Sequence, residues 1–142
     1  MPAQPAYNPR EHWSTFMEVV GDCPVEDLDE AKAYCRKIFN SSKDVGWAIP
    51  LGFALWRTES YKEALNELLK ASLYENLDAQ YNTIVGMTAR RIPGKENLAK
   101  KAYFRAIRID PERADIYYNY ANLIRDDSPE LAERAYLISL EL

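Results

Sequence analysis

The sequence predicts an all-α fold of about eight helices, paired antiparallel and stacked in chain order. Small residues recur about every 34 positions in two series, namely Gly52, Gly86, Ala121 and Ala64, Ala99, Ala132. Two further series follow the second one at four and seven positions, namely Leu68, Tyr103, Tyr136 and Ala71, Ala106, Ser139. This i, i+4, i+7 spacing places the last three series on one helix face. A repeat of this length is a helix pair that buries its apolar face only by stacking on its neighbours.

The spacing of these residues resembles the tetratricopeptide repeat (TPR) family. The resemblance covers residues 45–142 with regular spacing and 11–44 weakly, and Pro111 stands where a repeat of this family ends. Asn76 occupies the corresponding position of the preceding repeat, where the family has proline. The resemblance implies a right-handed superhelical α-solenoid whose first helices line a concave groove, the usual site for a peptide ligand.

The N-terminal part is the least regular. Residues 1–10 carry three prolines and no periodicity, so we expect a flexible leader before a domain of residues 11–142. Helices are expected over about 11–21, which has an amphipathic stripe, and about 25–40, which has Ala31, Cys35 and Ile38 at helical spacing. Residues 11–44 are therefore predicted to form a degenerate repeat that caps the stack.

The second repeat, residues 45–78, is predicted to hold helices over about 46–57 and 60–73. Pro50 is tolerated only in the first turn of a helix, so the first of these should begin late or be kinked. Thr58 or Ser60 can cap the second helix, and Glu63 completes a capping box with Ser60.

The third repeat, residues 79–113, is predicted to contain helices over about 78–91 and 95–109, separated at Pro93 and Gly94. The fourth, residues 114–142, is predicted to contain helices over about 114–125 and 128–141. Ser128 can cap the last helix, with Pro129 in its first turn. The apolar ending LISLEL suggests either the N-terminal part of a longer repeat protein or a homodimer through the C-terminal helix.

Composition narrows the classes of partner. The chain has 142 residues, 47% hydrophobic and 28% charged, with a net charge of -4, which argues against a nucleic-acid binder. The longest apolar run, over 46–56, is too short to span a bilayer, and the first residues lack the apolar core of a secretion signal. Cys23 and Cys35 are expected to be free thiols. We therefore expect a cytoplasmic protein with no membrane partner.

The periodic residues are expected to hold the fold. Gly52, Gly86 and Ala121 should lie where the two helices of a pair approach most closely, and Ala64, Ala99 and Ala132 should play the same part on the second helices. Leu68, Tyr103 and Tyr136 are predicted to fill the space between consecutive repeats.

The resemblance places a candidate partner-binding groove on the first helices. It would be lined by Phe53, Trp56, Arg57, Met87, Arg90, Arg91, Tyr118, Asn122 and Arg125, with Ile49, Gln80, Thr83 and Asp115 beside them. A row of arginines beside an apolar strip suits a peptide with carboxylates and apolar anchors. An alternative interpretation is that each arginine caps the negative end of its own helix dipole.

Three hypotheses for the function follow. The first is a protein–protein interaction scaffold or adaptor that binds a peptide or protein in the groove. The second is a docking or regulatory part of a larger enzyme, because residues 117–126 resemble the repeats that precede the catalytic domain in O-linked N-acetylglucosamine transferase-type glycosyltransferases. The third is a homodimerisation module. The clamp that grips chaperone tails is absent, because Ile49, Phe53 and Ile84 occupy its positions. The sequence shows no catalytic, cofactor or metal motif, so we expect no enzyme.

Overall fold

The computed structural model describes residues 9–142, so the predicted leader lies outside the described residues except for 9 and 10, which begin the first helix. The α-helices of the described part are α1 (Pro9–Asp22), α2 (Leu28–Ser42), α3 (Ala48–Arg57), α4 (Tyr61–Leu69), α5 (Ala79–Ala89), α6 (Glu96–Ile109), α7 (Ala114–Ile124) and α8 (Pro129–Glu141). Its 3-10 helices are η1 (Val25–Asp27), η2 (Val45–Trp47) and η3 (Ser72–Asn76).

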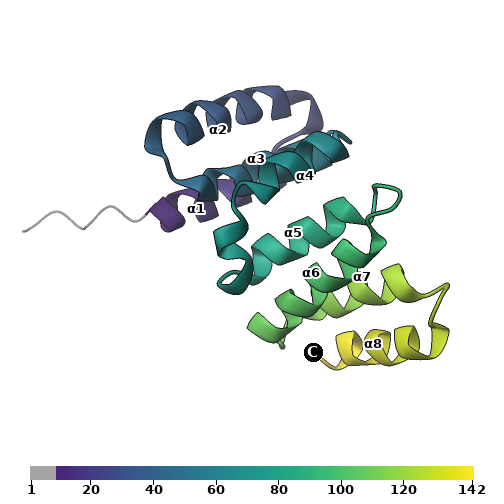
Figure 1. The fold of residues 1–142 in the computed structure, drawn as a ribbon. Coiled ribbons are helices and arrows are strands. Elements are labelled where there is room, and N and C mark those ends of the chain that lie inside the picture. The colour runs from purple at the N-terminus through teal and green to yellow at the C-terminus, as the bar shows by residue number, and fades with distance from the viewer. Residues whose placement is uncertain (1–8) are drawn as a thin grey trace, which may run out of the picture.

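The last six α-helices form three antiparallel pairs that stack in chain order (Figure 1). The pairs are α3 with α4, α5 with α6, and α7 with α8. Consecutive pairs meet where the second helix of one packs on the first helix of the next, as α4 does on α5 and α6 on α7. The predicted all-α stack of helix pairs is confirmed.

Two glycines set the distance between the helices of a pair. A Cβ added to Gly52 would lie 2.5 Å from Cδ2 of Leu68, and one added to Gly86 would lie 2.7 Å from Cε1 of Tyr103. The predicted close approach at both glycines is therefore confirmed. Leu68 and Tyr103 were predicted to lie between repeats. In the structure each packs on the glycine of its own pair, where its large side chain fills the space left by the missing Cβ.

The first pair is built differently. The backbones of α1 and α2 do not approach each other as those of the later pairs do; instead both helices pack on α3. Glu18 stands 34 positions before Gly52, so no small residue allows a close approach there. Aromatic rings fill the wider space between α1 and α2. The centroid of the Phe16 ring lies 5.0 Å from that of Tyr34 and 5.8 Å from that of Trp47.

Several helix ends differ from the predicted ones. α3 begins at Ala48 after a 3-10 turn, which places Pro50 in its first turn as predicted. α4 ends at Leu69, earlier than predicted, and η3 carries the chain on to Asn76. The predicted capping box of Ser60 and Glu63 is wrong: the Ser60 side chain makes no cap hydrogen bond, and Glu63 pairs with Arg36 of α2.

At the start of α8 the prediction holds in part. Pro129 lies in the first turn as predicted, but the Ser128 side chain makes no cap hydrogen bond.

The two cysteines are free, and Cys35 is fully buried while Cys23 is partly exposed. None of the described helices is long and apolar enough to cross a membrane. Residues 9–142 contain no group of three or more His, Cys, Asp or Glu side chains that could hold a metal ion.

The glycine contacts predict a specific cost of adding one methyl group. We expect Gly86→Ala to lower the free energy of unfolding by about 1–3 kcal/mol, because its Cβ overlaps the buried ring of Tyr103. Urea unfolding followed by circular dichroism measures this change. Gly21→Ala in α1 is the matched control, because its Cβ would meet nothing closer than 3.8 Å. Equal stability of Gly86→Ala and the wild type would contradict the proposed packing.

Candidate functional site on the first helices

The first helices of the pairs share one surface. Ser14 of α1, Gln80 of α5 and Arg113, which precedes α7, line a single polar hollow of about 340 Å³ together with Ile109 and Asp110. The Arg113 guanidinium is held by Asp115 at 2.7 Å. The hollow lies between the second turn of α1 and the N-terminal ends of α5 and α7, so three different pairs contribute to it.

The predicted groove residues of α3 lie against α1. The rings of Phe53 and Trp56 stack, with centroids 5.9 Å apart and planes inclined by 12°. Phe53 is partly buried and packs with Val20 and Leu28 of the N-terminal pair. Phe53 therefore serves the contact between α3 and the N-terminal pair, Trp56 stacks on it, and both side chains keep only part of their surface in solvent.

Two of the residues expected beside the groove are buried. Ile49 has no exposed surface and belongs to the main core, and Thr83 is only 4% exposed. The Thr83 hydroxyl donates to the carbonyl of Ala79 in its own helix. Neither side chain can line an open groove, because neighbouring helices cover both.

Arg57 is bound within the fold. Its guanidinium nitrogen Nη1 donates to the carbonyl of Val20 at 2.7 Å and to the carbonyl of Cys23. These carbonyls lie at the C-terminal end of α1, where backbone acceptors lack partners within the helix. Arg57 therefore caps the end of α1, in contrast to the alternative prediction that it caps its own helix.

The predicted residues of α5 point to different neighbours. Met87 is partly buried against the core of the last two pairs. Arg90 lies near Tyr103; burial raises the pKa of Tyr103 to about 12, and the charge of Arg90 offsets part of that rise. Arg91 is exposed and lies over the ring of Tyr61 in α4, 5.1 Å from its centroid.

The α7 residues form the most accessible part of the predicted site. Tyr118 is 54% exposed and meets Tyr136 of α8 edge-on, with centroids 5.7 Å apart. The Tyr136 hydroxyl donates to the side-chain oxygen of Asn122, which fixes the orientation of that amide. Arg125 is 65% exposed at the end of the same helix, 3.8 Å from Asp126. The Tyr118 ring, the Asn122 amide and the Arg125 guanidinium thus lie on one accessible face of α7.

Sequence reasoning missed one interaction of this surface. Tyr136 was predicted as a packing residue, yet its hydroxyl orients Asn122. Tyr103 carries a hydroxyl at the same repeat position, so the sequence alone does not single out Tyr136.

Comparison with known proteins bears on the fold. No known family model and no curated protein sequence matches the chain. Among solved structures, MamA MSR-1 C2, a TPR-containing protein, matches with a TM-score of 0.69 and 16% sequence identity, over 93% of this chain and 90% of that chain. The chain has a TPR-like fold. At this identity the likeness establishes the arrangement of the helices, and that arrangement agrees with the repeat spacing.

Within the TPR-like array the four predicted arginines have four different environments. Arg57 binds the end of α1, Arg90 lies near Tyr103, Arg91 lies over Tyr61, and Arg125 is largely free in solvent. Their recurrence in sequence therefore reflects the recurrence of the helix ends, and each side chain then follows its local neighbours.

The bound state of Arg57 predicts a difference in stability between two arginines. We expect Arg57→Gln to lower the free energy of unfolding by about 1–3 kcal/mol, because charged hydrogen bonds to the end of α1 are lost. Arg125→Gln removes the same charge from an exposed position and should change stability by less than about 0.5 kcal/mol. Urea unfolding of both variants tests the assignment, and equal losses would refute it.

Proposed function

We propose that the protein is a protein–protein interaction scaffold that binds a partner peptide or protein on the surface of its first helices. The TPR-like fold supports a scaffold of this kind, because a stack of helix pairs presents an extended surface to a partner. The observation that carries the proposal is the exposed group on α7, Tyr118 with Asn122 and Arg125.

The chemistry of this group suits a peptide ligand. Tyrosine and arginine are the residues that most often dominate binding energy, because each combines a large contact area with directed polar groups. The Asn122 amide is oriented by Tyr136 before any partner arrives, which lowers the entropy lost on binding. Arg125 can form a bidentate contact with a carboxylate of the partner.

The test is recovery of partners from a lysate by crosslinking and quantitative mass spectrometry. We expect Tyr118→Ser/Arg125→Ala to reduce recovery of a specific partner by about tenfold or more, the effect of losing one interface hot spot. Leu73→Ser/Arg108→Ala is the control, because both residues are exposed on η3 and α6, outside the first helices. Equal recovery by all three proteins would place the binding site elsewhere.

A second candidate function is self-association through α8. Leu137 is 51% exposed and Leu140 82% exposed. They stand 33 positions after Phe104 and Ile107 of α6, which contact α7: Phe104 lies 4.9 Å from Tyr120 between ring centroids, and Ile107 packs in the same cluster. The position that α6 uses to contact the next helix is thus uncovered on α8 within the described chain.

A further inference from the structure

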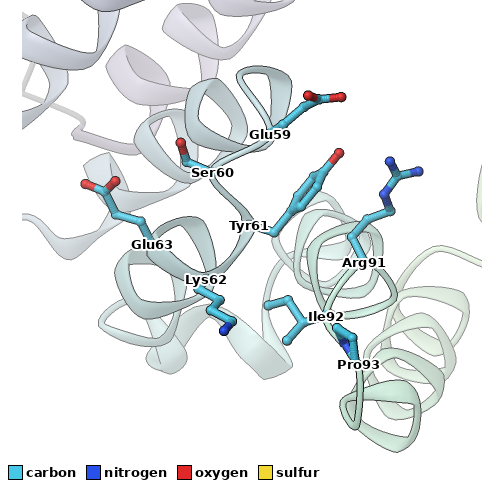
Figure 2. Close-up of a pocket in the computed structure, with 8 residues that line it drawn as sticks. All are labelled: Glu59, Ser60, Tyr61, Lys62, Glu63, Arg91, Ile92 and Pro93. Carbon is cyan, nitrogen blue, oxygen red and sulfur yellow. The ribbon is translucent and has the colours of Figure 1, made fainter.

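A groove runs along α4 on the side that faces the loop between α5 and α6. Two adjacent hollows of about 350 and 300 Å³ share Lys62 and Ile92 in their walls. We call their combined surface the α4 groove. It is lined from α4, from the turn before α4 and from the loop after α5 by Glu59, Ser60, Tyr61, Lys62, Glu63, Leu65, Asn66, Leu69, Arg91, Ile92, Pro93 and Lys95. Figure 2 shows its upper part, where the Tyr61 ring lies beside Arg91 and the Lys62 side chain extends toward Ile92.

The floor of the α4 groove is apolar. Leu65 and Ile92 are almost fully buried at its base, whereas Leu69 leaves 46% of its surface in solvent. Covering an exposed leucine removes apolar surface from water, which stabilises a complex by roughly 25 cal/mol for each Å² buried. The floor therefore favours an aliphatic side chain as its occupant.

The rim of the α4 groove is cationic. Lys62, Arg91 and Lys95 make no salt bridge with any described carboxylate. Of the two glutamates that line the groove, Glu63 is held by Arg36 and extends away from Arg91, while Glu59 stands at the outer edge (Figure 2). Three cations against one free carboxylate form a local positive surface on a chain whose net charge is -4.

The exposed face of α8 has the complementary chemistry. Glu133, Leu137, Leu140 and Glu141 follow a helical i, i+4, i+7, i+8 spacing, so they share one face. Glu130 lies near the same face, and all five side chains are exposed. No described cation pairs with these three glutamates.

We propose that α8 of one copy docks in the α4 groove of a second copy, with Leu137 and Leu140 on the apolar floor and the glutamates along the cationic rim. The contact joins two different surfaces, so each docked copy still presents a free groove and a free α8. Such head-to-tail contacts extend into chains unless the rotation between copies closes a ring. The proposal makes the α8 self-association above specific, and its failure leaves partner binding by the first helices untouched.

The experiment uses charge reversal on each surface separately. One variant is Lys62→Glu/Lys95→Glu in the groove, the other is Glu133→Lys/Glu141→Lys on α8, and the control is Lys37→Glu/Lys101→Glu at exposed positions of α2 and α6. Sedimentation velocity at increasing concentration, at low and at high salt, measures the average mass. Circular dichroism confirms that each variant is folded.

We expect the wild type and the control to associate with concentration, less so at high salt, because exposed charge pairs are screened. Each single-surface variant should associate at least about tenfold more weakly, as lost and repulsive charge pairs predict. The variant carrying all four reversals should regain association, since the two surfaces are again complementary. Leu140→Ser should weaken association as well, because the apolar anchor is lost.

Two outcomes would overturn the proposal. A wild type that stays monomeric at every concentration would mean that a different molecule, such as an acidic peptide, occupies the α4 groove. Association abolished by the α8 reversal yet unchanged by the groove reversal would indicate a symmetric contact between two α8 helices.

Discussion

The close packing of a large side chain on a glycine, within one helix pair, is the contact on which the rest of the structure depends. Leu68 fills the space over Gly52, and Tyr103 fills the space over Gly86. Each contact sets how near the two helices lie, and thereby which faces remain for the next pair. Ala121 is fully buried at the corresponding position of the last pair. Because this geometry repeats, the first helices come to lie side by side and form a common surface.

The N-terminal pair lacks this contact and is held by other means. Trp13 of α1 lies against Gly46, where an added Cβ would come within 3 Å of the indole ring, and it also meets Tyr74 edge-on. Arg57 binds the carbonyls at the other end of α1. α1 is thus attached at both ends to segments from the second repeat. The N-terminal pair consequently follows the position of α3 and contributes Ser14 to the hollow beside α5 and α7.

The features that could be predicted from the sequence are those set by the spacing of residues within one repeat. The helix pairs, the role of the two glycines and the place of Pro50 all follow from residues within one repeat, whose relation is set by helix geometry. The partners of Glu63 and Arg91 were not predictable in this way, because Arg36 and Tyr61 lie about 30 positions away in the chain. Their contacts depend on how one pair is rotated on the next. The candidate site was accordingly predicted as a set of positions, and the structure distinguishes Arg57, which is bound, from Tyr118, which is exposed.

A partner can contact only side chains that the stack leaves exposed. On the first helices these include Tyr118 and Arg125, and elsewhere they include the rim of the α4 groove and the outer face of α8. The α4 groove is lined by α4 and the loops beside it, and Tyr118 lies on α7, so head-to-tail docking of α8 in the α4 groove would leave Tyr118 uncovered. A chain of copies would then display the first-helix surface many times. Linked copies bind a partner with repeated motifs more tightly than separate ones, because each further contact forms at a high effective concentration. Weak individual contacts at Tyr118 and Arg125 would therefore suffice for a scaffold that acts as an assembly.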